Sequence, residues 1–446
     1  MLHYVRHLPS PRGSAGGSKS AASPEDLFEP DDHGGDGDAN LSRLDFRHES
    51  RLVTPQANIC TRLVCQILLA VLLIGCTSTQ RVAYLADEAN SAQVSGFHAI
   101  RTNLDARPDT MAKPPQRAHA SSKAEMNYLV ISGGGSGGAF SAGVLKAWSE
   151  TGTRPRFDIV SGVSTGALIA PYAFLGSSYD DRLVDLYTSG VAKNLVDAKW
   201  LPTGLLGTSL LKQGPLRKMV ERYITEDVLK RVAVEHRKGR RLLVLTSNLD
   251  SQRAVIWDMG AIANSGKPDA LRLFQDVLIA SASIPGVYPA VLIRVHSGNH
   301  VFEEMHSDGG SGSQILAVPD GFMTSANSAK PRPGVRLNMY VLVNNALMPE
   351  FENVKNNTLS VIARAYSIQV KSQTRSALLA SYMFAQRVGI RFHVASIDRQ
   401  IDYSVLDPFN TEYMRSVFRL GYSETIAGKL WKDKPIFSET KAEFAP

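Results

Sequence analysis

Short apolar runs alternate with stretches of helical periodicity from about residue 126 onward. Tyr128–Ile131 and Phe157–Val160 contain β-branched or aromatic residues and end at glycine-containing turns, which is typical of buried strands. Each run is followed by a segment with apolar residues three or four positions apart, Ala139–Glu150 and Ala167–Leu175, which predicts a helix. The pattern therefore predicts two consecutive strand–loop–helix units.

The same alternation continues through the second half of the chain. The strand-like segments are Arg241–Thr246, Asn299–Glu304, Val335–Val343 and Ile390–Ala395, and the helix-like segments are Asp269–Ala280 and Val354–Gln386. We expect the apolar residues of Val354–Gln386 to pack in the core rather than to form a lid. Because strands alternate with helices, the sequence predicts a single α/β domain over residues 126–446.

The part of the chain before this domain has a different composition. Residues 1–50 mix Gly, Ser, Pro, Asp and Ala without a period of 2 or 3.6, so ordering them would cost more entropy than burial returns. We expect residues 1–50 to be disordered or not translated. Residues 77–125 are polar and interrupted by proline, and we expect them to form a tether.

An apolar run, Leu63–Cys76, separates these two polar stretches. At fourteen residues it is shorter than the run of about twenty that a straight membrane-spanning helix needs. It fits the hydrophobic region of a signal peptide, with Arg51 and Arg62 as a weak positive flank. The alternative is a short buried or interfacial helix.

The end of this run, Leu73-Ile-Gly-Cys76, resembles a bacterial lipobox. The resemblance implies that residues 51–76 are a signal peptide and that Cys76 becomes the lipidated first residue of the mature protein. Because a signal peptide stands at the start of a chain, we expect translation to begin internally, near Val53. The expected product is a membrane-anchored bacterial lipoprotein that faces the periplasm, with the outer membrane favoured over the inner.

Composition narrows the possible chemistry. The three cysteines are Cys60, Cys65 and Cys76, which excludes a disulfide framework or a Cys-ligated metal site in the main body. The net charge is +7 although residues 1–50 hold five Lys/Arg and nine Asp/Glu, so the rest of the chain is distinctly basic. A basic body favours contact with anionic surfaces such as phospholipid headgroups, or is simply a solvated surface. No arginine-rich tract or RNA-binding aromatic motif indicates a nucleic-acid partner.

The first predicted strand runs into the glycine-rich loop Ser132–Phe140. Glycine permits positive φ and close approach of a ligand, and the unpaired amides at the following helix N-terminus can bind an oxygen atom. Gly133, Gly135 and Gly138 also satisfy G-x-G-x-x-G, with Asp158 twenty residues further on, so a dinucleotide-binding protein is an open alternative. A Walker A loop is excluded because no Gly-Lys-Ser/Thr follows.

The second predicted strand runs into Gly162-Val-Ser-Thr-Gly166, which has the G-x-S-x-G pattern of a nucleophile elbow. A serine at a sharp strand-to-helix turn presents its hydroxyl beyond the sheet edge, and its neighbours two positions away must be small. The helix N-terminus behind it also favours developing negative charge. Ser164 is therefore a candidate nucleophile, with Gly162 and Gly166 shaping the elbow.

A serine nucleophile needs a base. His393 lies in a strand-like segment rather than in a catalytic loop, so it is a poor candidate. Asp308 lies in Ser307-Asp-Gly-Gly310 after a predicted strand, where it is either the base or only a turn former. We expect the nearby His306 to be structural or on the surface.

Three motifs in this order resemble the patatin-like phospholipase family over about residues 126–320. They are Gly133–Gly138, Gly162–Gly166 and Asp308–Gly310, and the segments Thr246–Ile256 and Ala280–Pro289 between them also match. The resemblance implies a three-layer α/β/α fold with a mostly parallel central sheet in a single catalytic domain. It also implies a serine acyl-ester hydrolase with no metal or cofactor, acting on phospholipid or another acyl ester at a membrane surface reached through lipidated Cys76.

The resemblance assigns roles to particular residues. Ser164 corresponds to the nucleophile and Asp308 to its base, and the oxyanion hole corresponds to Gly133, Gly134, Gly135 and Ser136. Many relatives carry Arg or Lys where this chain has Gly137, which bears on the preference for phospholipid. The alternatives are a dinucleotide-binding protein and a non-catalytic lipid-binding lipoprotein. The apolar loop Lys193–Lys212 is a candidate for acyl-chain or membrane contact, or a buried crossover.

Overall fold

The computed structural model describes most of the chain from residue 81 onward. The chain divides into two compact units, Met1–Ala70 and Val71–Pro446, and the elements below all belong to the second. The described residues are 66, 81–107, 125–195, 209, 211–324, 334–399, 401 and 409–437. The expectations for residues 1–50 and for the signal peptide, apart from Gln66, therefore fall outside the described residues, as does Cys76.

Within the described residues, ten strands form one sheet, and five neighbouring strands in it are parallel. In spatial order these are β5 (Arg241–Asn248), β4 (Ile159–Val163), β3 (Glu125–Ile131), β9 (Arg336–Ala346) and β10 (Arg391–Ile397). Ile131 at the end of β3 pairs with Gly162 near the end of β4. The two loops that follow these strands therefore begin side by side at one edge of the sheet.

Antiparallel strands extend the sheet beyond β5. These are β8 (His300–Asp308), β7 (Val291–Ser297), β1 (Gln93–Val94), β6 (Arg253–Asp258) and β2 (Arg101–Asn103). Val163 pairs with Leu245 of β5, and the next residue of β5, Thr246, pairs with Asp308. Through its pairing with β5, Asp308 at the end of β8 therefore lies close to Ser164, the residue that follows β4.

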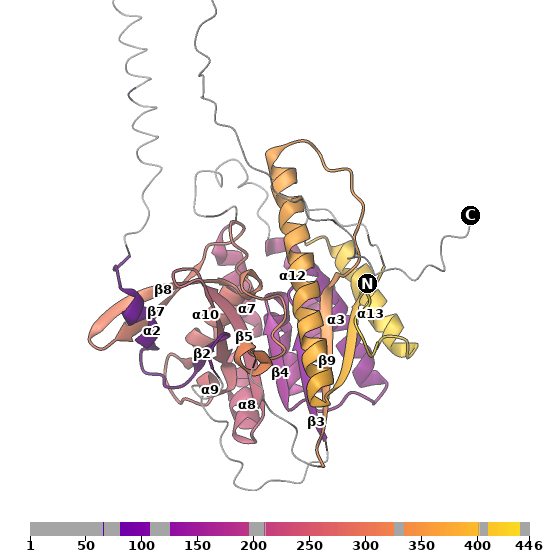
Figure 1. Ribbon diagram of the computed structural model, residues 1–446, viewed down its shortest axis with the longest axis horizontal. Coiled ribbons are helices and arrows are strands. Elements are labelled where there is room, and N and C mark those ends of the chain that lie inside the picture. The colour runs from indigo at the N-terminus through magenta and orange to yellow at the C-terminus, as the bar shows by residue number, and fades with distance from the viewer. Residues whose placement is uncertain are drawn as a thin grey trace, which may run out of the picture. The chain divides into compact units, whose positions relative to one another are not determined.

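Helices cover both faces of the sheet (Figure 1). Successive residues of β3 divide between two buried clusters, since Leu129 and Ile131 pack in one and Val130 in the other. The first cluster includes residues of α3 (Gly138–Glu150), α4 (Thr165–Leu175), α5 (Asp180–Thr188), α7 (Gln213–Tyr223), α8 (Glu226–Arg237), α9 (Met259–Ala263), α10 (Ala270–Ser281) and α13 (Thr411–Ile426). The second includes residues of α12 (Thr358–Val388). The predicted α/β/α layers around a mostly parallel centre are confirmed.

Helix α12 is 31 residues long and runs in front of β9 in Figure 1. It begins at Asn357, whose side chain accepts a hydrogen bond from the Ser360 amide, and ends at Gly389, which has the left-handed conformation common after helices. The prediction that its apolar residues lie in the core is correct for Leu378. It is wrong for five others, which are exposed: Ile362, Tyr366, Ile368, Leu379 and Met383. No helix in the described ranges is both long enough and apolar enough to span a membrane.

Residues 81–107 differ from the tether expected over 77–125, because they pack onto the sheet. They form α2 (Ala86–Ser91) and the strands β1 and β2, which pair with β7 and β6. Phe97 and Ile100 are buried in the main core. Edge strands as short as these leave no detectable period in the sequence, which is why the polar composition dominated the prediction.

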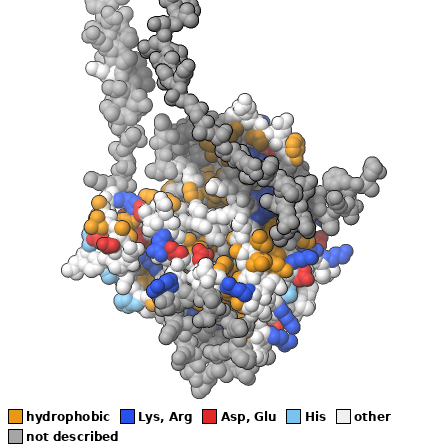
Figure 2. Space-filling view, in the orientation of Figure 1, with side chains coloured by type: hydrophobic (Ala, Val, Ile, Leu, Met, Phe, Trp, Pro, Cys, Tyr) orange, Lys and Arg blue, Asp and Glu red, His pale blue; other side chains and the backbone are white. Residues whose placement is uncertain are grey.

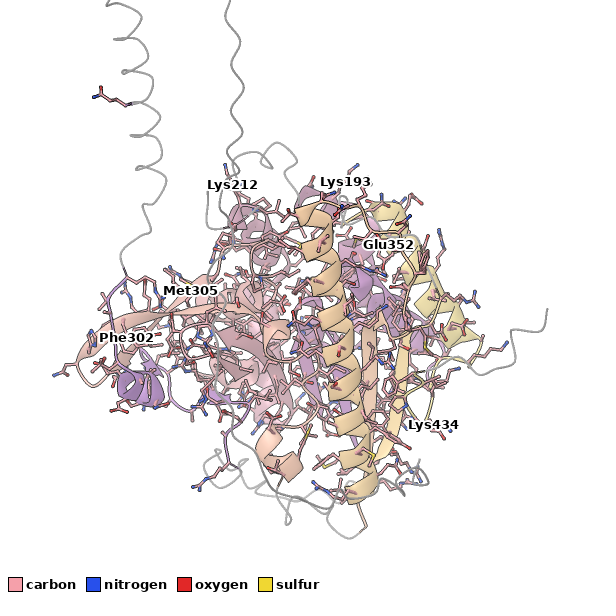
Figure 3. All side chains as sticks on the ribbon, turned by 45° about the horizontal axis from the view of Figure 1, so that its top comes forward. Lys193, Lys212, Phe302, Met305, Glu352 and Lys434 are labelled. Carbon is pink, nitrogen blue, oxygen red and sulfur yellow. The ribbon has the colours of Figure 1, made fainter. Side chains whose placement is uncertain are left out.

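This N-terminal arm also contacts the hairpin of β7 and β8, where Figure 3 labels Phe302 and Met305. The Tyr84 ring stacks on Phe302 with centroids 4.1 Å apart. Arg81 forms an ion pair of 2.6 Å with Asp250, whose carboxylate also accepts a hydrogen bond from the Met305 amide. The arm therefore braces the strand that ends at Asp308.

Candidate active site

Ser164 occupies the turn between β4 and α4. Its φ of 55° and ψ of −123° lie outside the regions that non-glycine residues usually adopt. The surrounding structure holds this conformation, because the Ser164 amide donates to the Ser281 hydroxyl at 3.0 Å and that hydroxyl donates to the Leu245 carbonyl at 2.7 Å. Such local strain is characteristic of functional positions. The structure therefore has the sharp elbow that the sequence predicted.

The two elbow glycines are required by close packing of the backbone. A β-carbon on Gly162 would lie 2.3 Å from the Gly166 carbonyl oxygen, and one on Gly166 would lie 2.3 Å from the Ile131 carbonyl oxygen. Both contacts are with backbone atoms, which cannot rotate away. Larger residues at either position would therefore push the serine turn away from β3.

Asp308 faces Ser164 across β5. The Ser164 hydroxyl donates a hydrogen bond of 2.6 Å to Oδ2 of Asp308, and the Gly310 amide donates one of 2.7 Å to Oδ1. The Asp308 amide in turn donates to the Ser283 carbonyl at 2.9 Å. Both oxygens of the carboxyl group therefore have donors, and the group is held in a fixed orientation toward the serine.

Burial sets the acidity of this carboxyl group. Asp308 is 3% exposed, and burial raises its pKa to about 7, although the hydrogen bonds from Ser164 and Gly310 act in the opposite direction. A carboxylate with a pKa near neutrality is a far stronger proton acceptor than an ordinary aspartate. The site thus pairs a serine hydroxyl with an unusually basic carboxylate.

The glycine-rich loop lies against the serine. A β-carbon on Gly133 would be 3.4 Å from Cβ of Ser164. Gly134 and Gly135 have φ of 148° and 54°, which favour glycine, and a 3₁₀ turn, Gly135–Gly137, leads into α3. Amides in the first turn of a helix have no acceptor within that helix. The loop therefore presents the amides of Gly134, Gly135 and Ser136 at a helix N-terminus beside the serine.

Gly133 differs from the other three residues expected in the oxyanion hole. Its amide donates to the Gln314 carbonyl at 3.1 Å, so this N–H group already has an acceptor. The Gln314 side chain donates to the Gly310 carbonyl at 3.0 Å. Gln314 therefore connects the glycine loop with the turn after Asp308, and Gly133 shapes the loop rather than offering a free donor.

Asn344, which the sequence analysis did not single out, supports the loop from β9. Its side chain is 1% exposed, donates to the Ser132 carbonyl at 2.9 Å and accepts from the Ser141 hydroxyl at 2.6 Å. A β-carbon on Gly137 would lie 2.1 Å from the backbone carbonyl oxygen of Asn344, which leaves no room for a side chain at position 137. The only signal for this residue in the sequence was an asparagine at the end of an apolar strand.

The dinucleotide interpretation fails on the position of Asp158. In dinucleotide sites the acidic residue lies at the same sheet edge as the glycine loop. Here Asp158 immediately precedes β4, and its carboxylate accepts a hydrogen bond from the Asn127 amide at 3.0 Å, in the first half of β3. Asp158 therefore lies at the opposite end of the strands from Gly133.

His393, which was weighed as a base, and His306, which was not, both have other contacts. His393 stacks on Tyr340 with centroids 4.7 Å apart. His306 is fully buried, and its ring contacts the Thr246 hydroxyl at 2.9 Å and the Glu304 carboxylate at 3.1 Å. His306 is thus structural rather than a surface residue. Among the described residues, no three His, Cys, Asp or Glu side chains are grouped as metal ligands would be.

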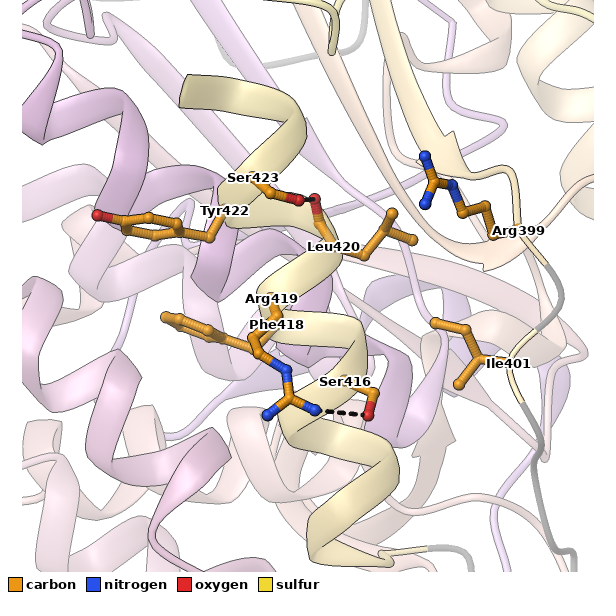
Figure 4. A pocket seen from close by; sticks show the side chains of 8 residues that line it. All are labelled: Arg399, Ile401, Ser416, Phe418, Arg419, Leu420, Tyr422 and Ser423. Atoms are coloured by element: carbon orange, nitrogen blue, oxygen red, sulfur yellow. Dashed lines mark hydrogen bonds between the residues drawn. The ribbon is translucent and has the colours of Figure 1, made fainter. Parts of the chain in front are cut away.

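A hollow of about 570 Å³ lies beside α13, away from the residues above (Figure 4). Its lining consists of Arg399, Ile401, Ser416, Phe418, Arg419, Leu420, Tyr422 and Ser423. None of these is a predicted site residue. Most of the loop Lys193–Lys212, the sequence candidate for acyl-chain contact, lies outside the described residues.

Comparison with known proteins places this geometry in context. Residues 129–318 match the sequence model of the family described as patatin-like phospholipase. The chain is similar to the solved structure of VipD from Legionella pneumophila, with 11% identity, a TM-score of 0.33, and 79% of this chain and 72% of VipD covered. It is also similar to the type III effector protein ExoU, with 12% identity, a TM-score of 0.28, and 69% of this chain covered. The chain covers 53% of ExoU, about half its length. No curated protein matches the sequence.

Proposed function

We propose that the chain is a serine acyl-ester hydrolase that acts on lipids, since residues 129–318 match the family described as patatin-like phospholipase. The observation that carries the proposal is the hydrogen bond of 2.6 Å between the Ser164 hydroxyl and the Asp308 carboxylate. The glycine loop lies beside this pair at a helix N-terminus. In our proposal Ser164 is the nucleophile, Asp308 is the base and the loop amides are the oxyanion donors, which are the groups that acyl transfer requires.

The first half of the reaction forms an acyl-enzyme. Asp308 accepts the hydroxyl proton while Oγ of Ser164 forms a bond to the ester carbonyl carbon. The amides of Gly134, Gly135 and Ser136 stabilise the negative oxygen of the tetrahedral intermediate, at about 3 kcal/mol for each well-placed donor. When the intermediate collapses, the bond to the alcohol breaks and Asp308 returns its proton to the departing oxygen.

The second half regenerates the enzyme. A water molecule takes the place of the alcohol, Asp308 accepts one of its protons, and the resulting oxygen attacks the acyl carbon. Collapse releases the fatty acid and returns the proton to Ser164. A single carboxylate can perform both steps because its raised pKa lets it accept and return a proton near neutral pH.

Phospholipid is the proposed substrate class. The family match and the basic character of the chain support it. The missing basic side chain at Gly137 has a structural reason, because the Asn344 carbonyl fills that space. In our proposal, groups outside the glycine loop therefore recognise the headgroup.

We also propose that Cys76 is lipidated and anchors the protein to a bacterial membrane, facing the periplasm and with the outer membrane favoured. The motif Leu73-Ile-Gly-Cys76 supports this. Metabolic labelling with an alkyne fatty acid should tag the wild-type protein and not the Cys76→Ala variant. Equal labelling of the two would refute the anchor without affecting the proposed chemistry.

The decisive test of activity compares wild type with Ser164→Ala and Asp308→Asn on a short-chain soluble ester and on phospholipid vesicles. Both variants should lose activity by at least about a thousandfold, because nucleophile and base act as a unit. Ser281→Ala, which keeps both groups, is the matched control and should retain part of the rate. Full activity in Ser164→Ala would refute the role of this serine, and an inert wild type that still binds lipid would instead indicate a non-catalytic binding protein.

A further inference from the structure

We propose that the outward face of α12 is a docking surface for anionic phospholipid bilayers. This inference rests on the proposed function, since it identifies how the hydrolase would reach a substrate that resides in a membrane. It is carried by the exposure of apolar side chains on α12, by the charge of the helix and by its contacts with the site.

The concentration of exposed apolar groups on α12 is unusual. Fifteen large apolar side chains are exposed among the described residues, and six of them belong to this helix. They are Val361, Ile362, Tyr366, Ile368, Leu379 and Met383. Ile362, Ile368 and Met383 each expose about 60% of their surface. Hydrophobic side chains gather over α12 on the face shown in Figure 2. Clusters of exposed apolar groups mark interaction sites more often than single exposed residues do.

The orientation of the helix explains this exposure. Thr374 and Leu378 are fully buried and mark the side that faces the sheet. Since each residue of an α-helix turns by about 100°, Val361, Leu379 and Met383 lie on the side opposite to these two. The apolar groups therefore lie on the outward side of the helix in two clusters, at residues 361–368 and 379–383, with exposed polar residues between them.

Polar contacts hold the helix in this orientation. Arg364 forms an ion pair of 3.0 Å with Glu352, which Figure 3 places beside the N-terminal half of α12. Lys371 forms one of 2.9 Å with Glu350. These charged side chains of the N-terminal half point to the protein while apolar ones point away. A helix in water normally has the reverse arrangement.

The charge of α12 suits an anionic membrane. The helix contains no Asp or Glu, and its four charged residues are Arg364, Lys371, Arg375 and Arg387. Arg364 and Lys371 are paired with Glu352 and Glu350, so the positive charge that could meet headgroups comes from Arg375 and Arg387, whose side chains donate to backbone carbonyls. Apolar groups together with such cations are typical of helices that lie in a lipid headgroup region.

The face is continuous with the candidate active site. The Gln373 side chain donates to the Gly312 carbonyl at 3.1 Å, in the turn that follows Asp308. Partial burial and the charge of Asp308 together raise the pKa of Tyr366 to about 12, so this side chain lies within electrostatic reach of the carboxylate. A bilayer against α12 would therefore lie close to the turn that follows Asp308.

The test must report on α12 itself, because the apolar run Leu63–Cys76 can bind vesicles without it. In the full chain, Ile368→Trp is compared with Ile426→Trp, which replaces an isoleucine on α13 that is 50% exposed against 61% for Ile368, and wild type with its four tryptophans is the baseline for both. Vesicles of phosphatidylglycerol and phosphatidylcholine carry bromine on their acyl chains, which quenches nearby indoles. We expect quenching of the indole introduced by Ile368→Trp, at a depth of about 5–10 Å, and none of the one at position 426. The proposal would be overturned if the two introduced indoles are quenched equally. It would also be overturned if neither is quenched although the protein is bound to the vesicles.

A second arm measures hydrolysis with Ile362→Asp and Ile368→Asp combined, against Ile426→Asp as control. Hydrolysis of anionic vesicles should fall by roughly tenfold or more, while hydrolysis of a soluble short-chain ester stays unchanged. An equal fall with both substrates, or a loss of dimers in light scattering, would overturn the proposal in favour of a structural or self-association role. If the indole introduced by Ile368→Trp is quenched by the vesicles but the wild-type protein hydrolyses no ester, the proposed function is refuted while the docking surface is supported.

Discussion

The Ser164 hydroxyl and the Asp308 carboxylate lie 2.6 Å apart although 144 residues separate them in the chain. Strand β5 brings them together, because Leu245 pairs with the residue before Ser164 and Thr246 pairs with Asp308. The hydroxyl donates to one carboxylate oxygen while Gly310 occupies the other. This relationship defines the proposed catalytic pair and leads to the first two predictions.

Activity should depend on the ionisation of Asp308. Burial raises the pKa of this carboxyl group to about 7, and only its ionised form can accept the serine proton. We therefore expect kcat/KM on an uncharged soluble ester to rise with pH through about 7 and to level off above it. A rate that is constant between about pH 5 and pH 8 would contradict this assignment of the base.

The same carboxyl group should make stability depend on pH. Its pKa is higher in the folded protein than the value of about 4 in an unfolded chain. Its stabilising contribution is therefore complete below about pH 4 and is lost as the pH rises to about 7. Asp308→Asn, which cannot ionise, should exceed wild type in unfolding free energy by up to about 4 kcal/mol at pH 8, with little difference at pH 4.

Urea unfolding at the two pH values measures this difference. The matched control is Asp181→Asn. The Asp181 side chain is 91% exposed, so this substitution removes no buried charge. The control should change little at either pH. If Asp308→Asn is less stable than wild type at pH 8, burial of the Asp308 charge is not what limits the stability of the wild-type protein at that pH.

Gly137→Ala should disable the glycine loop by steric conflict alone. The φ of Gly137 is −60°, which alanine adopts freely, but its β-carbon would lie 2.1 Å from the Asn344 carbonyl oxygen. We expect a loss of about 1–3 kcal/mol in stability and a lower kcat, because the oxyanion amides would shift. Gly214→Ala on α7 has open space and should be neutral or slightly stabilising. Wild-type kinetics in Gly137→Ala would refute the role of this packing.

Arg101→Gln should destabilise the fold through the N-terminal arm. Arg101 pairs with Glu304 of β8, which is 1% exposed, so the substitution leaves a buried carboxylate without its cation. The expected cost is about 3–5 kcal/mol in denaturant unfolding. Arg253→Gln, which breaks the exposed pair with Asp105, should cost less than about 1 kcal/mol. Similar costs for the two substitutions would show that the arm contributes little.

Local signals were sufficient for the central elements of the fold. The predicted strands at Tyr128–Ile131 and Arg241–Thr246 lie within β3 and β5, and the predicted helix Asp269–Ala280 differs from α10 by one residue at each end. These segments combine an apolar period with turn residues at their ends, so neighbouring residues alone specify them. The arm at residues 81–107 lacked such a period, and its strands exist only because the sheet edge accepts them.

The site shows the same division. The glycine loop, the serine elbow and the Asp-Gly-Gly turn were visible as motifs, because each needs small residues at fixed spacing around one reactive group. Asn344 and Gln314 were not visible, since an isolated buried amide has no pattern and only its partners reveal its role. Likewise, periodicity showed that α12 is a helix but not which of its sides faces the sheet.

The sequence by itself therefore determined the α/β alternation, the candidate nucleophile Ser164 and the candidate base Asp308. Only the tertiary structure decided that these two side chains touch, that Gly133 has its amide already bonded, and that α12 turns its apolar face outward. The physical reason is that strands and tight turns depend on neighbouring residues. Hydrogen bonds across the sheet, burial and the resulting shift of the Asp308 pKa depend on residues that only the folded chain brings together.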